Sequence, residues 1–148
     1  MAEPPIPEQG LLLTHCIVSG DFQRSRRFYT DVLGGQTVLD GSSDGEPAVV
    51  QLANGWIIIN TGGGPTEDKP AVTLAAPSDP DRTSAFLNVR VADIHAVYAD
   101  WTAKGATFLT EPMDRGQEIR CYLCDPDGHL IEVGQLTFTL AQFREMTR

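Results

Sequence analysis

The chain has 148 residues and a formal net charge of −9 at pH 7. This length suffices for one domain that buries a core without disulfides or a structural metal. The negative charge argues against nucleic acid or an anionic membrane as the main partner, since both are bound by basic surfaces. The apolar runs around Leu11–Leu13 and Trp56–Ile59 are too short to span a bilayer, and without a charged-then-apolar pattern in the first residues we expect no secretion signal. Three cysteines without a disulfide framework suit a reducing compartment, so we expect a cytoplasmic protein.

The first half of the chain predicts one helix among several strands. Residues 1–10 (MAEPPIPEQG) are proline-rich and predict a flexible arm. An apolar run predicts a strand within 11–20, and Asp21 then stands where a helix N-cap belongs. Apolar residues at helical spacing predict a helix over 22–33, which Gly34-Gly35 ends. Three more strands are predicted at 36–40, 47–53 and 56–61, with a hairpin turn at Asn54-Gly55 between the last two.

The second half repeats this order after a linker. Residues 63–82 are rich in Gly, Pro and Asp and predict a linker or a long ordered loop. A strand is predicted over 84–91, Asp93 is the next N-cap, and a helix follows over 94–104 until Gly105. Three further strands are predicted at 107–112, 118–124 and 129–135, and the tail, 137–148, predicts a short closing helix.

The two halves have the same internal spacing. From Asp21 to Asn60 is 39 residues, and from Asp93 to Glu132 is also 39. Such a repeat indicates a duplicated βαβββ unit, whose sheet leaves one face to be covered. We therefore predict an α+β fold with two tandem βαβββ modules in a single domain, residues 11–136. Module one is 11–62, the linker is 63–82 and module two is 83–136, with 13–61 superposing on 85–133.

Glu132 is the residue that most needs an explanation. It follows the turn Asp125–Gly128 and lies on a strand between Ile131 and Val133. Burying a carboxylate there is costly unless a partner compensates it. Glu132 is therefore either a metal ligand or catalytic base, or a strand carboxylate paired with an arginine such as Arg120 or Arg90.

Several motifs together resemble a known superfamily. The segments Thr14–Val18, SRRFYTDVLGG (25–35), VADI (91–94) and DPDGHLIEVG (125–134) are similar to the vicinal oxygen chelate superfamily. That group includes glyoxalase I, the bleomycin- and fosfomycin-resistance proteins and the extradiol dioxygenases. The resemblance covers residues 11–136. It implies two βαβββ modules whose curved sheets form a cleft, in which metal-dependent members hold a divalent cation by residues of the first and last strands of each module.

Carried onto this chain, the resemblance implies a partial ligand set. Glu132 falls on the last-strand position, as metal ligand and catalytic residue, and His15 falls on or beside the first-strand position. His15 lies six residues before Asp21, whereas many members have seven, which would place Thr14 there instead. Because neighbouring strand residues face opposite sides, this one-residue choice decides which side chain points into the cleft.

The remaining positions of the implied set carry no strong ligand. The module-two counterpart of His15 is Phe86 or Leu87, and the module-one counterpart of Glu132 is Asn60 or Ile59. The implied metal is one divalent ion, Zn, Ni, Mn or Fe, held by His15 and Glu132. The CxxC of Cys121 and Cys124 lies within a strand pattern and is expected to be packing rather than a zinc site.

Two functions follow from the resemblance. The first is a metal-dependent lyase, isomerase or dioxygenase acting on a small organic molecule in the cleft. The alternative is a metal-free protein that binds or sequesters a small molecule, as the bleomycin-binding members do. In either case we expect a homodimer and a common set of substrate-binding residues, namely Trp56, Asn60, Phe86, Asn88, Arg120 and Tyr122.

Overall fold

The computed structural model describes residues 2–42 and 44–148, and it divides the chain into two units. The first unit runs up to residue 82 and also contains the loop 125–129. The second unit consists of residues 83–124 and 130–148.

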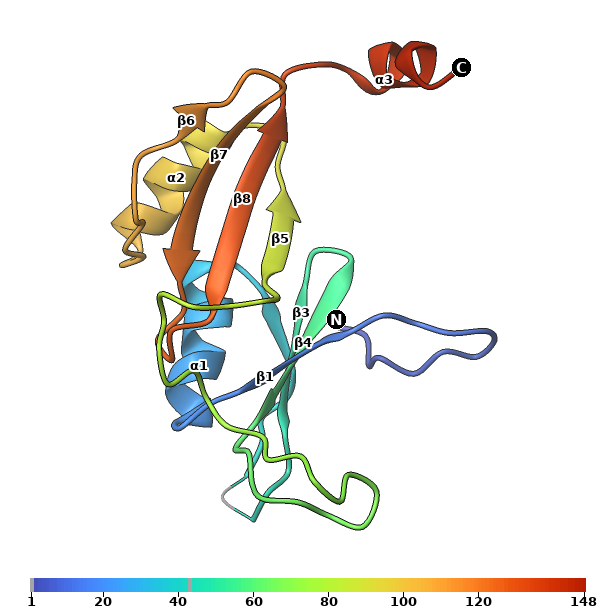
Figure 1. The fold of residues 1–148 in the computed structure, drawn as a ribbon, viewed down its shortest axis with the longest axis vertical. Coiled ribbons are helices and arrows are strands. Elements are labelled where there is room, and N and C mark those ends of the chain that lie inside the picture. Colours follow the sequence, from blue (N-terminus) through green and yellow to red (C-terminus); the bar gives the residue numbers. More distant parts are fainter. Residues whose placement is uncertain (1, 43) are drawn as a thin grey trace. The chain divides into compact units, whose positions relative to one another are not determined.

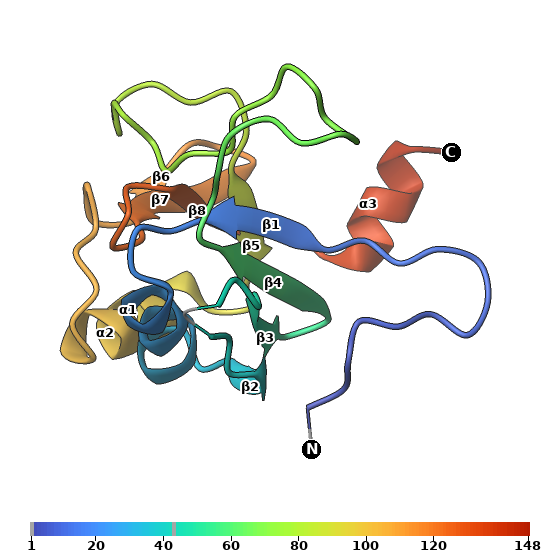
Figure 2. The same cartoon turned by 90° about the horizontal axis from the view of Figure 1, so that it is seen from below.

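The first unit is a four-stranded sheet with a helical segment. Its elements are β1 (His15–Val18), α1 (Phe22–Arg27) followed by the π-helical turn η1 (Phe28–Val32), β2 (Gln36–Leu39), β3 (Ala48–Leu52) and β4 (Gly55–Asn60). The strand order is β1-β4-β3-β2, with β1 parallel to β4 and the other pairs antiparallel (Figures 1 and 2).

The predicted helix forms for the expected reasons. Asp21 is its N-cap, and the Asp21 side chain accepts a hydrogen bond of 3.0 Å from the backbone N–H of Arg24. Ser25, Tyr29 and Leu33 are buried, as the helical spacing predicts. After the helix, a Cβ on Gly35 would lie 2.5 Å from the Val50 side chain, so only glycine lets this turn pack so closely on β3.

The second unit has the same strand order. Its elements are β5 (Leu87–Arg90), α2 (Ile94–Ala103), β6 (Met113–Asp114), β7 (Glu118–Cys124), β8 (Leu130–Leu136) and α3 (Leu140–Met146). The order is β5-β8-β7-β6, with β5 parallel to β8. Two mixed four-stranded sheets, each following a β-α-β-β-β order, confirm the predicted α+β class. The predicted tail helix is present as α3, which opens with a capping box at Thr139.

Strand register corrects the alignment of the two repeats. Cys16 and Asn88 each lie five residues before a capping aspartate, and they pair with Ile58 and Glu132 respectively. The counterpart of Glu132 in the first sheet is therefore Ile58, not Asn60 or Ile59. The equal spacing of 39 residues misled because Ile58 follows its capping aspartate by 37 residues, whereas Glu132 follows its own by 39. One of the two extra residues lies between the cap and the cross-strand partner, Val49 or Tyr122, and the other lies in the hairpin that follows this partner.

Two local predictions were also wrong. The segment 107–112 is not a strand: only Phe108 bridges to Leu123, and pairing resumes at Met113. Pro112 has no backbone N–H that could donate to a neighbouring strand. The Phe108 ring packs against Tyr98 and Trp101 of α2. The β3–β4 turn is centred on Ala53-Asn54, one residue earlier than predicted.

Among the described residues, no helix has both the length and the apolar character needed to cross a membrane.

Candidate functional site

The second sheet has two chemically different faces. One face is apolar and packs with α2: Leu123, Ile131 and Val133 are fully buried, as is Ile94 of the helix. Figure 1 shows α2 running along one side of this sheet. Because successive strand residues alternate, the other face carries mainly polar side chains. We call this the polar face; it consists of Phe86, Asn88, Arg90, Glu118, Arg120, Tyr122, Glu132 and Gly134.

Glu132 occupies the centre of the polar face and is held by two neutral donors. Its side chain is buried, with 7% of the residue exposed. Asn88 Nδ2 donates to Oε1 at 2.7 Å, and the Tyr122 hydroxyl donates to Oε2 at 2.5 Å. Both donors lie within hydrogen-bonding distance because Asn88 on β5 and Tyr122 on β7 are the direct cross-strand neighbours of Glu132. The desolvation cost is thus offset by hydrogen bonds from neutral donors, and Arg120 and Arg90, which the sequence offered as one alternative, form their salt bridges with Glu118 instead.

The two arginines bind a different carboxylate. Arg90 Nη1 lies 3.2 Å from Glu118 Oε2, and Arg120 Nη1 lies 3.0 Å from Glu118 Oε1. Glu118 therefore bridges the two guanidinium groups on the polar face. Glu118 was not among the residues predicted from the sequence, although its alternation with Arg120 and Tyr122 on one strand places it on the same face.

Tyr122 is a neutral hydrogen-bond donor on this face. Its hydrogen bond to the Glu132 carboxylate raises the pKa of the hydroxyl, and partial burial raises it further. The Phe86 ring lies edge-on to the Tyr122 ring, with centroids 6.3 Å apart. The polar face thus joins an aromatic surface to a fixed set of hydrogen-bonding groups.

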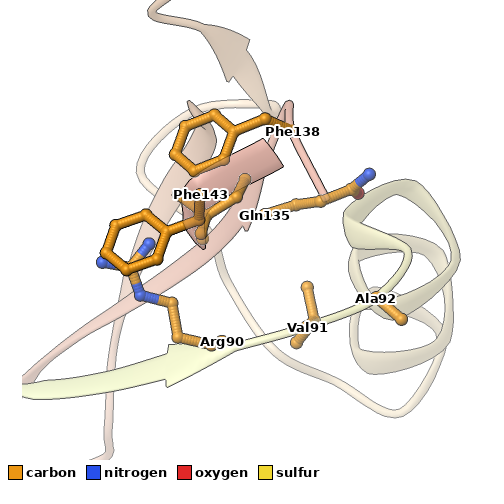
Figure 3. A pocket seen from close by; sticks show the side chains of 8 residues that line it. Arg90, Val91, Ala92, Gln135, Phe138 and Phe143 are labelled. Atoms are coloured by element: carbon orange, nitrogen blue, oxygen red, sulfur yellow. The ribbon is translucent and has the colours of Figure 1, made fainter. Parts of the chain in front are cut away.

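A pocket of about 670 Å³ opens at one end of the polar face. It shares Arg90 and Gly134 with that face, and the tail contributes Phe138 and Phe143. These two phenyl rings are almost parallel, with centroids 6.1 Å apart. Figure 3 shows them beside each other, with the Arg90 side chain extending toward the Phe143 ring.

Three of the predicted site residues belong to the first unit. His15 lies on the same side of β1 as buried Ile17, whereas its neighbour Cys16 is exposed on the opposite side. Burial lowers the pKa of His15, His129 lowers it further and Asp125 opposes the shift. By alternation Thr14, and not His15, lies on the side of Cys16. Which of the two side chains faces a ligand cleft stays a prediction.

Trp56 and Asn60 lie on that other side of the first sheet. Asn60 Nδ2 donates to Cys16 Sγ at 2.8 Å, and Trp56 Nε1 donates to the carbonyl of Glu3 at 2.7 Å. The structure thus brings Phe86, Asn88, Tyr122 and Glu132 together, with Arg120 beside them through Glu118.

The side chains present do not fit a bound divalent ion. Across residues 2–42 and 44–148, no group of three or more His, Cys, Asp or Glu lies together so that it could hold one. Both oxygens of Glu132 accept hydrogen bonds from neutral donors, and His15 turns toward the buried side of its sheet. Ligation by His15 and Glu132 remains a prediction, which is tested below.

The acidic turn motif at 125–129 forms hydrogen bonds with η1 and with the end of β1 in the first unit. Asp125 is 4% exposed; its Oδ1 accepts the backbone N–H groups of Asp127 and His129, and its Oδ2 accepts the Tyr29 hydroxyl at 2.9 Å. His129 Nε2 lies 2.7 Å from the carbonyl oxygen of Val18. Burial raises the pKa of Tyr29 well above its ordinary value, so this hydroxyl stays protonated. These contacts give the motif a structural role at the end of β1.

Two units with the same β-α-β-β-β order, and a polar sheet face built around a last-strand carboxylate, define a class of small α+β proteins with duplicated modules. The model of the Glyoxalase/Bleomycin resistance protein/Dioxygenase superfamily matches residues 12–133, and the chain belongs to this superfamily. The comparison with curated proteins finds no match.

Solved structures agree on the fold. TnmS3, an antibiotic binding protein from a Streptomyces species, is 16% identical with a TM-score of 0.62, covering 89% of this chain and 100% of its own. The fosfomycin resistance protein FosX from Listeria monocytogenes is 18% identical with a TM-score of 0.62, covering 90% and 98%. A glyoxalase/bleomycin resistance protein/dioxygenase from Nocardioides is 20% identical with a TM-score of 0.65, covering 88% and 86%.

Proposed function

We propose that the polar face and its adjoining pocket bind a small organic molecule without a metal ion. The observation that carries this proposal is the hydrogen bonding of Glu132. Its two oxygens hold Asn88 and Tyr122 in fixed positions, so the carboxylate organises a binding surface instead of supplying open ligand positions. TnmS3, which shares the fold, is an antibiotic binding protein, and this supports the same kind of role here.

The surroundings define the class of ligand. The pocket volume of about 670 Å³ lies in the range of sites for drug-sized molecules. The rings of Phe86, Phe138 and Phe143 favour a flat, largely aromatic molecule. On the polar face, Arg90 and Arg120 are balanced by Glu118 and Glu132, so a ligand needs hydrogen-bonding groups more than a net charge.

A ligand screen tests the proposal. We expect aromatic natural-product antibiotics, screened by thermal shift and confirmed by calorimetry, to yield a stoichiometric binder. Phe86→Ala and Phe143→Ala each remove aromatic contact area and should weaken that binder by about tenfold. Leu109→Ala, at a residue that is 62% exposed and outside the polar face, is the matched control and should leave affinity unchanged.

The competing function is a metal-dependent lyase, isomerase or dioxygenase with His15 and Glu132 as ligands. Titration of metal-stripped protein with Zn²⁺, Ni²⁺ and Mn²⁺ separates the two. We expect no binding heat from any of these ions, in the wild type or in Glu132→Gln and His15→Ala. One ion bound per chain, lost in both variants, would overturn the metal-free proposal.

A further inference from the structure

The N-terminal arm is held on the first sheet through the backbone of one residue. The N–H of Glu3 donates to Gln51 Oε1 at 2.8 Å, and the Glu3 carbonyl accepts from Trp56 Nε1 at 2.7 Å. Gln51 and Trp56 are direct partners across β3 and β4. Two side chains on adjacent strands therefore form hydrogen bonds with both the backbone N–H and the backbone C=O of Glu3.

This arrangement imitates a strand pairing. In an extended residue the N–H and C=O point to the same side, which lets a neighbouring antiparallel strand meet both at once. Here an amide oxygen and an indole N–H take the place of that neighbour. Glu3 precedes Pro4, which biases it toward extended backbone, and neither Pro4 nor Pro5 has an N–H with which to continue a ladder. The hydrogen bonding to Gln51 and Trp56 is thus confined to Glu3, the residue before the prolines.

The rest of the arm leaves the sheet. Ile6 of the arm is 73% exposed, and Leu11 and Leu13, which connect the arm to β1, are 83% and 84% exposed. Figures 1 and 2 show the dark blue N-terminal segment as a wide loop between the N-terminus and β1. Two hydrogen bonds alone give little net affinity in water, so the arm's main advantage over an external peptide is its tether. A short flexible tether gives an effective concentration of about millimolar.

We propose that the Gln51–Trp56 pair is a binding site for an extended, proline-rich peptide, occupied in cis by residues 2–10. An external peptide of this class competes with the arm for the same two side chains. It must present a residue with an N–H immediately before proline. The site lies in the first unit, so its test does not depend on any ligand of the polar face.

The indole N–H signals of the two tryptophans, Trp56 and Trp101, report on this site by NMR. Trp56→Phe assigns them. Deletion of residues 2–10 should shift the Trp56 signal and speed its exchange with water, since its carbonyl partner is gone. Glu3→Pro should act in the same direction, because it removes the N–H that Gln51 binds. Glu3→Gln is the matched control: the contacts use only the backbone, so the signal should stay in place. Trp101 is buried in the second unit, so its signal should stay in place in every variant. Circular dichroism and urea unfolding show that the variants remain folded.

Titration with the acetylated peptide of residues 2–10 completes the test. We expect it to restore the wild-type Trp56 signal in the deletion variant and to bind the full chain at least about tenfold more weakly, because the tethered arm competes. Gln51→Leu in the deletion variant, or Glu3→Pro in the peptide, should abolish the effect. An unchanged Trp56 signal on deletion, or a peptide with no effect at millimolar concentration, would overturn the proposal.

Discussion

Glu132 is compensated by the geometry of its own sheet. Its cross-strand neighbours, Asn88 and Tyr122, each supply one neutral donor, while Glu118 satisfies the arginines. The sequence showed that a carboxylate between Ile131 and Val133 needs a partner, since that follows from burial alone. It could not show which partner, because cross-strand neighbours depend on register across three strands that are distant in the chain.

Removal of the Tyr122 hydroxyl tests this account. Tyr122→Phe leaves Glu132 Oε2 without its donor in a buried position, which should lower the free energy of unfolding by about 1–3 kcal/mol. Urea denaturation at pH 7 measures the change. Tyr98→Phe, where the ring packs against Phe108, should cost less than about 0.5 kcal/mol. Equal, small costs for the two variants would mean that water replaces the lost donor.

His15 should make stability depend on pH below neutrality. Burial lowers its pKa from the ordinary value of 6.5, so the folded state favours the neutral ring more than the unfolded state does. Its contribution is complete above pH 6.5 and is lost as the pH falls through the folded-state pKa. We expect urea midpoints to decline from about pH 7.5 to 5.5, and less so in His15→Gln. The exposed His95 provides the control, since His95→Gln should keep the wild-type slope.

At the scale of elements, the β3–β4 turn contains a strained residue. Ala53 has a φ of +51° and is the one non-glycine residue with positive φ in the part of the chain that the structure describes. The left-handed conformation costs a residue with a Cβ about 1–2 kcal/mol. Glycine adopts it without strain and loses only about 0.5–1 kcal/mol through the larger entropy of its unfolded state.

Ala53→Gly should therefore stabilise the protein by up to about 1 kcal/mol. Thermal and urea unfolding measure this gain. Asn54→Gly, at the neighbouring turn residue, gives no such relief and should be neutral or destabilising. A loss of stability in Ala53→Gly would show that the left-handed conformation carries little strain.

Local signals predicted most elements because their causes are local. Asp21 and Asp93 cap their helices, and Gly34-Gly35 and Gly105 follow them, as expected from capping and glycine conformation. The segment 107–112 failed because Phe108 packs its ring against α2, Leu109 is exposed and Pro112 has no N–H for a ladder. The alignment of Glu132 with Asn60 or Ile59 of the first module failed because the second repeat has one more residue before its last hairpin and one more within it, which equal spacing along the chain cannot reveal.

At the scale of the whole molecule, the tail leaves apolar surface exposed. Leu140, Phe143 and Met146 of α3 are 64%, 45% and 61% exposed. A helix of seven residues is too short to be stable on its own in water and relies on packing. Exposed apolar residues gathered on one short element indicate a surface that another chain covers.

We therefore expect a two-fold dimer, in which a second copy covers α3. Light scattering coupled to gel filtration should give twice the 16.1 kDa of one chain at micromolar concentration. Leu140→Ser combined with Met146→Ser removes the apolar anchors and should shift the mass to that of the monomer, while Phe143 stays in place to line the pocket. Leu109→Ser, equally exposed but on the segment after α2, should remain dimeric. A mass of 16.1 kDa for the wild type at every concentration would reject the dimer, and dissociation of both variants alike would place the interface elsewhere.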